Sequence, residues 1–468
     1  MSWRERWREP GGGGELLRLS LPLILSNSIW TLQVTIDRIF ISRLGTEPLA
    51  ATMAAVMLFW TPFALLQNTA NYATTFVAQY LGAGRPGRVG PAVWQSLWFS
   101  CGSGLAFLLL VPLAGPIVDF GGHSPAVQAL EIDYFVCLCY SALPTLIIAS
   151  VGSFFAGRGD SWTVLGINSV GLSVNALLDY AWIFGHWGFP AWGIVGAGWA
   201  TVVGQWASAL VGLGLMLRAR HRQEFATLAG WRFDGELFQR LMRFGLPSGL
   251  QWALDCLAFT AFIFLVGRLG DAELAATNIA FTINMIAVLP ALGIGQGVSI
   301  LVGQRLGEDR PDLAERSTWS GFRIAWLYMA LMAFLYIAVP EVFVLLFHTS
   351  DGEGKVAELV VVLLRFVAVY SLFDCMNFVF SFALRGAGDT RFVTLVSLVL
   401  AWPIMVLPTA AALEYGWGLS WSWAFCSGYI VALALTFLLR FVYGPWKSMR
   451  VIEAAVSTES ENESGSVH

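Results

Sequence analysis

Four polar residues in the first half of the chain have the side chains that hold a proton or a small cation. They lie inside long apolar stretches and are Asp37, Asn175, Asp179 and Thr201. Asn175 and Asp179 are four residues apart, so a helix places them on one face. Two carboxylates, an amide oxygen and a hydroxyl suit a hard cation, and neighbouring carboxylates can share a proton. We interpret this set as a site for Na⁺ or H⁺.

Two acids in the second half, Asp255 and Asp374, also lie in apolar stretches, and neither has Lys or Arg close by in the sequence. An ionisable side chain at membrane depth costs at least about 2.5 kcal/mol and by default marks an ion or substrate pathway. The sequence therefore predicts a second H⁺ or Na⁺ site at these two acids. The alternative is a pair of protonated carboxyl groups that only satisfy hydrogen bonds.

Arg38 directly follows Asp37 and brings a positive charge beside the first site. Consecutive residues of a helix do not face each other, which disfavours an Asp37–Arg38 pair. Pairing of Arg38 with an acid from another helix, such as Asp179, stays open. In that case Asp37 would belong to a salt-bridge switch, and ion coupling would rest with Asp255 and Asp374.

Long apolar segments must position these residues. Of the 468 residues 57% are hydrophobic and 12% charged, whereas soluble domains carry roughly 25% charged residues. Runs of about 20 apolar residues predict about twelve membrane-spanning helices. Their expected ranges are 16–42, 47–81, 92–118, 127–156, 161–184, 193–218, 236–267, 272–305, 312–346, 356–385, 390–413 and 420–443. The six cysteines all fall in these apolar segments, which predicts free buried thiols.

The distribution of Lys and Arg predicts how the chain is oriented. With the N-terminus in the cytoplasm, 21 of the 27 fall in cytoplasmic loops or ends, and three, Arg43, Arg268 and Lys355, fall outside. The positive-inside rule favours this arrangement. We therefore expect a multi-pass protein of the inner (cell) membrane with both termini in the cytoplasm.

The two halves repeat one pattern with a shift of 225 residues. A Val-x-Gln-x-Leu-Gly motif at 77–82 returns at 302–307, and Leu-Pro at 21–22 returns at 246–247. Six helices per half with the same orientation indicate a parallel duplication. We predict an all-α membrane protein with two pseudo-symmetric six-helix bundles around a central cavity. The expected divisions are an N-terminal arm at 1–15, an N-lobe at 16–218, a cytoplasmic linker at 219–235, a C-lobe at 236–443 and a disordered cytoplasmic tail at 444–468.

A Gly-x-Gly-Asp pattern, typical of intramembrane aspartyl proteases, occurs at 157–160 and at 386–389. Both copies lie at equivalent helix ends beside an arginine, where Gly and Asp serve as turn and cap residues. A catalytic motif is not expected twice at matching turns. We therefore favour the capping interpretation and predict that the protein is not an enzyme.

The chain resembles the multidrug and toxic compound extrusion (MATE) antiporters over roughly residues 15–445. The resemblance rests on Leu-Pro at 21–22, Ile-Asp-Arg-Ile-Phe-Ile-x-Arg-Leu-Gly at 36–45, Ala-Gln-Tyr-Leu-Gly at 78–82 and Leu-Arg-Gly at 384–386. It implies a V-shaped pair of six-helix bundles that alternates between inward and outward openings. It also implies expulsion of organic cations against inward-moving Na⁺ or H⁺.

The same resemblance implies roles for individual residues. An N-lobe cation site would comprise Asp37, Asn175, Asp179 and Thr201, and a C-lobe acidic site would comprise Asp255 and Asp374. Pro22 matches a proline whose bend in the first helix is tied to protonation. Arg38 departs from the family pattern, in which small or polar residues are commoner, and would modulate the N-lobe site.

Together these features predict a secondary antiporter that exports organic, cationic, drug-like compounds in exchange for protons or sodium. Its expected partners are small organic substrates and membrane lipid, without nucleic acid, and it is expected to act as a monomer with no cofactor besides the coupling ion. The alternative is a lipid-linked saccharide flippase of similar architecture, which needs a cationic cavity. Only Arg38, Arg323 and Arg365 are placed to supply one, which argues against it.

Overall fold

A computed structural model of the protein describes residues 7, 9–119, 121, 123–345 and 354–453. These described residues form helices and no strands. Twelve helical segments among them are long and apolar enough to cross a membrane, in agreement with the helix ranges expected from the sequence. The prediction of an all-α polytopic membrane protein is confirmed.

The first six segments form the N-lobe. In chain order its elements are α2 (Gly13–Ser42), α3 (Thr46–Asn71), α4 (Ala73–Gly82), η1 (Pro86–Arg88), α5 (Val89–Phe107), η2 (Leu108–Leu113), α6 (Ala114–Asp119), α7 (Pro125–Gly157), α8 (Ser161–Phe184) and α9 (Gly193–Met216). The short helices α10 (Ala219–Phe225) and η3 (Ala229–Trp231) lie in the linker between the lobes.

The last six segments form the C-lobe. Its elements are α11 (Gly235–Gly267), α12 (Asp271–Gly307), α13 (Pro311–Ala338), α14 (Pro340–Leu345), α15 (Gly354–Ala387), α16 (Thr390–Ala401), η4 (Trp402–Val406), α17 (Leu407–Glu414) and α18 (Leu419–Tyr443), followed by η5 (Pro445–Ser448). The helix expected at 312–346 ends earlier, at Ala338, because Pro340 cannot continue it. A single π-helical turn at η4 contains Pro403 and joins α16 to α17.

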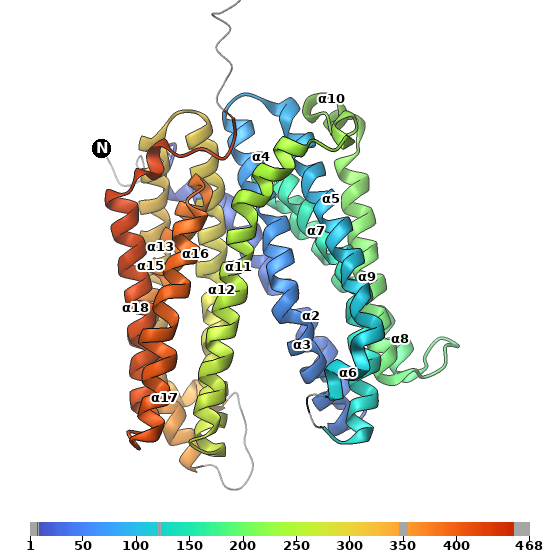
Figure 1. The fold of residues 1–468 in the computed structure, drawn as a ribbon, viewed down its shortest axis with the longest axis vertical. Coiled ribbons are helices and arrows are strands. Elements are labelled where there is room, and N and C mark those ends of the chain that lie inside the picture. Colours follow the sequence, from blue (N-terminus) through green and yellow to red (C-terminus); the bar gives the residue numbers. More distant parts are fainter. Residues whose placement is uncertain (1–6, 8, 120, 122, 346–353, 454–468) are drawn as a thin grey trace, which may run out of the picture.

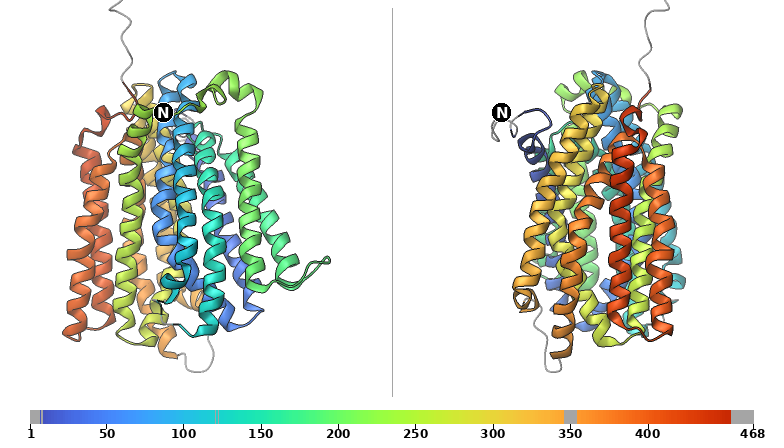
Figure 2. Two further views of the ribbon diagram at one scale, coloured as in Figure 1. Left: turned by 45° about the vertical axis from the view of Figure 1, so that its right-hand side comes forward. Right: turned by 90° about the vertical axis from the view of Figure 1, so that its left-hand side faces the viewer.

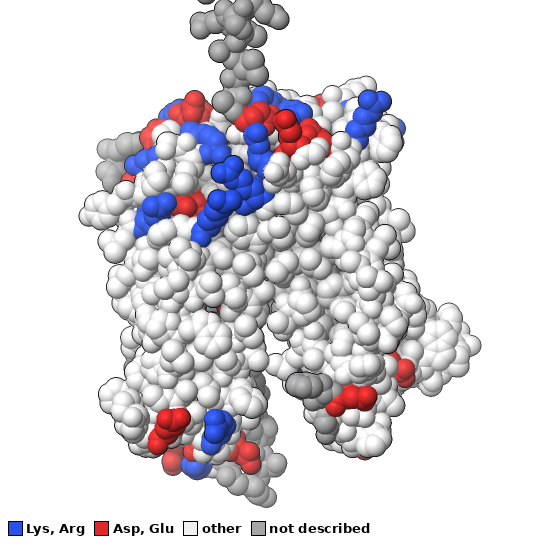
Figure 3. All heavy atoms as spheres, in the orientation of Figure 1, with Lys and Arg blue, Asp and Glu red and all other residues white. Residues whose placement is uncertain are grey.

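The two bundles meet at one end of the molecule and diverge toward the other (Figure 1), and they overlap in the turned views of Figure 2. The contacts between them are crossed, because α2 packs against α12 and α3 packs against α11. Figure 3 shows that Lys and Arg gather at the end where the bundles meet, and that a cleft between the lobes opens at the other end. We call these two ends the basic end and the open end. The prediction of two helical lobes is confirmed.

The prediction of disorder over 444–468 is wrong for its first ten residues. They include η5, in which Trp446 is buried against Phe441, and a strap at 449–453 whose Val451 is buried. These apolar side chains leave water for preformed surfaces of both lobes, which stabilises an ordered path. The remainder of the predicted tail, 454–468, lies outside the described residues.

Candidate functional site

The four residues predicted for the N-lobe site come together in the structure. Asp37 lies on α2, Asn175 and Asp179 lie one turn apart on α8, and Thr201 lies on α9. Helix α8 packs against both α2 and α9, which brings the four side chains to one place. The carboxyl groups of Asp37 and Asp179 lie close enough to interact electrostatically. The Asn175 amide nitrogen donates to the Thr201 hydroxyl at 3.4 Å.

Four oxygens of this N-lobe cluster are buried and lack hydrogen-bond donors. Asp179 and Asn175 are fully buried and Asp37 is 8% exposed. One carboxylate oxygen of Asp37, the amide oxygen of Asn175 and both carboxylate oxygens of Asp179 have no hydrogen-bond partner. Two facing ionised carboxylates only accept hydrogen bonds and repel each other, so a proton or a cation must lie between them. The cluster therefore fits both coupling ions predicted from the sequence.

Close helix packing positions the cluster. A Cβ atom on Gly204 of α9 would lie 2.9 Å from the Gly171 carbonyl oxygen and 3.0 Å from the Asn175 Cβ, so only glycine allows α8 and α9 this approach. Tyr134 of α7, which the sequence reasoning missed, is buried close enough to interact electrostatically with Asp37 and Asp179. It stands among ordinary aromatic core residues in the sequence, so no local signal marks it.

Arg38 and Pro22 occupy different surroundings on α2. The Arg38 side chain is exposed, and no ion pair with an acid is found for it among the described residues. This placement disfavours the salt-bridge switch considered above. Pro22 is buried within α2, which continues on both sides of it as one helix.

In the C-lobe, Asp255 takes part in a chain of hydrogen bonds. Its two carboxylate oxygens accept from the Gln251 amide nitrogen at 3.4 Å and from the Tyr429 hydroxyl at 3.3 Å. The amide oxygen of Gln251 accepts from a terminal nitrogen of the Arg385 guanidinium. The sequence predicts a helix over 356–385, which leaves Arg385 at the cytoplasmic end of that helix, but its side chain is buried in α15, because the helix continues to Ala387.

Asp374 lies apart from this chain. It is 8% exposed, and one of its carboxylate oxygens accepts from the Asn377 amide nitrogen at 3.5 Å, one turn further along α15. Among the described residues no hydrogen bond joins Asp255 to Asp374. The structure thus places both acids in the C-lobe interior as separate positions.

The repeated Val-x-Gln-x-Leu-Gly motifs close the basic end in a reciprocal way. Gln79 of the N-lobe donates through its amide nitrogen to the Gly386 carbonyl at 3.0 Å, and Gln304 of the C-lobe donates to the Gly157 carbonyl at 2.9 Å. The acceptors are equivalent helix ends of the two lobes. The Tyr72 hydroxyl adds a bond of 2.8 Å to the Arg385 carbonyl.

Glycines bring the backbones of the two lobes into contact at this closure. A Cβ atom on Gly82 would lie 2.0 Å from the Gln304 carbonyl oxygen, and one on Gly307 would lie 2.3 Å from the Gln79 carbonyl oxygen. Since 82 and 307, and 79 and 304, differ by 225, the two contacts are the same contact made twice. The two copies of the repeated motif therefore form the closure of the basic end.

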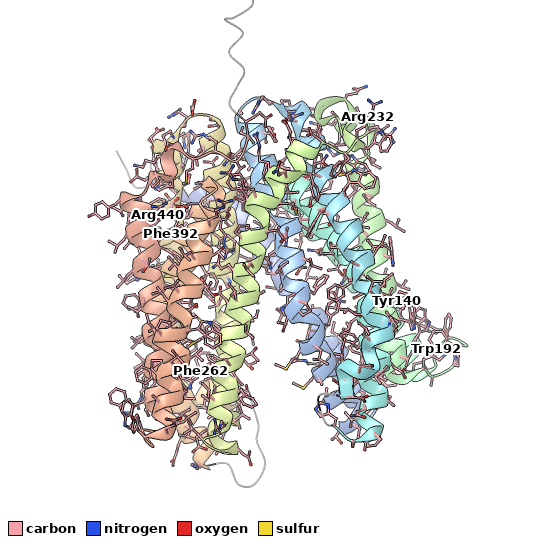
Figure 4. The ribbon with its side chains drawn as sticks, in the orientation of Figure 1. Tyr140, Trp192, Arg232, Phe262, Phe392 and Arg440 are labelled. Atoms are coloured by element: carbon pink, nitrogen blue, oxygen red, sulfur yellow. The ribbon has the colours of Figure 1, made fainter. Side chains whose placement is uncertain are left out.

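The two Gly-x-Gly-Asp copies have structural roles. Asp160 caps α8 by accepting from the Thr163 backbone amide and hydroxyl. Asp389 accepts from the Arg440 guanidinium at 2.7 Å, and the same guanidinium lies over Phe392, as Figure 4 shows near the basic end. Asp160 therefore caps α8 as expected, whereas Asp389 stands at the N-cap position of α16 without a side-chain capping hydrogen bond and pairs with Arg440 instead.

Comparison with known proteins agrees with this geometry. The MatE family model matches residues 22–181 and 247–410, one block in each lobe. The chain is 30% identical over 418 residues to the probable multidrug resistance protein NorM of Brucella suis biovar 1 (strain 1330), with 86% of each chain covered. It is also 30% identical to the protein of the same name from Xanthomonas axonopodis pv. citri, with 90% of this chain and 91% of the relative covered.

Solved structures share the fold. An outward-facing multidrug resistance MATE family transporter of the MOP superfamily has a TM-score of 0.85 at 21% identity, covering 96% of this chain and 98% of that one. A MOP superfamily transporter from Pyrococcus furiosus has a TM-score of 0.84 at 21% identity, covering 95% and 97%. With both repeats matched, and with relatives aligned across both lobes, the chain belongs to the MATE family of membrane transporters.

Proposed function

We propose that the protein is a secondary active antiporter that exports organic, cationic, drug-like compounds in exchange for protons or sodium. The observation that carries this proposal is the N-lobe cluster of Asp37, Asn175, Asp179 and Thr201, in which four buried carboxylate and amide oxygens lack donors. Cation occupancy there relieves the repulsion between two carboxylates. The multidrug resistance names of the relatives support the class of substrate.

In this proposal the basic end faces the cytoplasm, because membrane proteins concentrate Lys and Arg on that side. The cleft then opens outward, and the reciprocal glutamine bonds hold the inward exit closed. The monomer acts in the inner membrane with both termini in the cytoplasm. An organic cation and the coupling ion favour different access states, so a gradient of one drives export of the other.

The test is export of ethidium from proteoliposomes with imposed proton and sodium gradients applied separately. Asp37→Asn should reduce ion-driven export at least about tenfold, the scale of a typical coupling free energy. Asp133→Asn, an exposed acid on α7, is the matched control and should export like the wild type. Wild-type rates in Asp37→Asn would contradict the assignment of the N-lobe cluster.

A further inference from the structure

The buried guanidinium of Arg385 has no role in the proposal above, yet its surroundings are specific. Its side chain is 7% exposed and lies over the rings of Phe382, at 5.0 Å, and Trp252, at 5.9 Å. One terminal nitrogen donates to the amide oxygen of Gln251, whereas the buried Nε has no partner. A charge held by so few hydrogen bonds is sensitive to any change in its one polar neighbour.

The Gln251 amide is held in one orientation between Arg385 and Asp255. A guanidinium only donates, so the amide oxygen of Gln251 must face Arg385 and the amide nitrogen must face Asp255. The Asp255 oxygen on that side must then be an acceptor. If a proton or cation takes this oxygen, the Gln251 amide loses its acceptor, and turning the amide would set its NH₂ group against the guanidinium.

The backbone at Arg385 is also where the N-lobe holds the C-lobe. The Arg385 carbonyl accepts from the Tyr72 hydroxyl, and the next carbonyl, that of Gly386, accepts from Gln79. The side chain of Arg385 is thus connected to Asp255 through Gln251, while its main chain is part of the closure at the basic end.

The N-lobe does not repeat this chain. At the positions 225 residues before Gln251 and Asp255 stand Ser26 and Trp30. Arg158, the arginine at the equivalent helix end, lies over Phe154 at 4.3 Å and pairs with Asp160 at 3.9 Å. It makes no hydrogen bond to Asp37 or Asp179 among the described residues. Within the described residues, the chain from an acid at membrane depth to the closure is therefore found in the C-lobe.

We propose that Arg385, acting through Gln251, is a positioning residue that couples the state of Asp255 to closure of the basic end. With Asp255 accepting, the chain holds the end of α15 where Tyr72 and Gln79 bind it. When a coupling ion or substrate cation takes the Asp255 oxygen, the Gln251 amide reorients, the guanidinium shifts, and the closure weakens. This inference rests on the proposed antiport function.

The test measures closure directly. In a background without native cysteines, spin labels at Gly87→Cys and Asp312→Cys, two exposed turns of opposite lobes, report the distance across the basic end in liposomes. Wild-type protein is titrated with Na⁺ and, separately, with protons. We expect the distance distribution to follow one of the two ions.

Arg385→Gln should lose this response over the ion range that acts on the wild type, because its midpoint should shift by roughly tenfold or more in ion concentration. Gln251→Met, which keeps the volume and removes the amide, should lose it as well and serves if Arg385→Gln does not fold. Arg385→Lys should retain part of the response, because a lysine can still donate to Gln251. Arg391→Gln, at an exposed position of α16, is the matched control and should respond like the wild type.

A wild-type response in Gln251→Met, or an equal loss in Arg391→Gln, overturns the inference. A lower melting temperature with an unchanged ion response assigns Arg385 a merely structural role and overturns it too. In either case the antiport proposal stands if the wild type exports ethidium against an ion gradient. Failure of wild-type export with both ions, and no distance change, sinks the proposed function itself.

Discussion

At the residue scale, Gly204 shows how little space separates the helices that carry the N-lobe cluster. The Cβ of any larger residue would meet the Asn175 Cβ and a backbone oxygen of α8 at 3.0 Å or less. Because the nearer obstacle is backbone, α8 itself must shift, and Asn175 and Asp179 shift with it. The geometry of the cluster is therefore set by a residue that touches no ion.

Gly204→Ala should lower the free energy of unfolding by about 1–3 kcal/mol, the usual cost of overpacking, and should weaken ion-driven export. Gly214→Ala on the same helix is the control, because its Cβ would meet nothing within 4 Å and alanine favours the helix. Thermal unfolding in detergent and ethidium export measure the two effects. Equal behaviour of the two variants would show that the α8–α9 approach does not position the cluster.

At the element scale, the strap at 449–453 ties the end of the C-lobe to the N-lobe. The Val451 backbone amide donates to the Gln79 side-chain oxygen at 2.8 Å. The Glu453 carboxylate accepts from the Tyr80 hydroxyl at 2.6 Å and forms ion pairs with Arg85, Arg88 and Arg240. The strap therefore lies across the closure at the basic end and reinforces it.

This strap should weaken in acid. Partial burial favours the neutral form of Glu453, but the Tyr80 hydrogen bond and the charges of Arg85 and Arg88 outweigh it and hold its pKa below the ordinary value of 4.5. A lowered pKa means that the stabilisation is complete above about pH 4.5 and disappears as the pH falls through the lowered pKa. Glu453→Gln should loosen closure at neutral pH and remove this acid-dependent step.

The Gly87–Asp312 label distance measures that effect, with pH lowered from 7 to 3. Glu224→Gln is the control, because the one ion pair that Glu224 forms among the described residues is with the highly exposed Arg220 within α10. An unchanged distance distribution in Glu453→Gln at neutral pH would mean that the strap follows the closure without stabilising it.

At the scale of the whole molecule, the closure is built twice but is not fully symmetric. Gln79 and Gln304 make equivalent bonds across the lobes, and Gln79 alone also accepts from the strap. Each lost hydrogen bond costs about 1 kcal/mol, which is roughly fivefold in a population ratio. Gln79→Ala should therefore open the basic end more than Gln304→Ala does.

The spin-label distance in the two single variants checks this order. Their effects will not add in the double variant, since the two glutamine contacts are adjacent: a Cβ atom on Gly307, which faces Gln79, would lie 3.0 Å from the Cα of Gly82, which faces Gln304. A larger opening in Gln304→Ala than in Gln79→Ala would contradict the role given to the strap.

Much of this architecture could be predicted from the sequence, because membrane-spanning helices are long and apolar and the repeat keeps a constant shift. Asp37 and Asp179 were recognisable as acids at membrane depth. Arg385 was not, because an arginine at a helix end resembles a loop charge until the fold places Gln251 of α11 beside it. The strap was missed because Val451 and Glu453 have a partner only once both lobes are assembled.

The glycine contacts at the basic end have an electrical consequence. A methyl group on Gly82 or Gly307 would overlap a carbonyl oxygen of the other lobe, so the two backbones are too close at these two points for a water molecule to pass between them. Water files conduct protons, and a leak there would discharge the gradient on which an antiporter depends. In the proposed antiporter we expect Gly82 and Gly307 to block a proton leak, so their replacement should first lower the membrane potential.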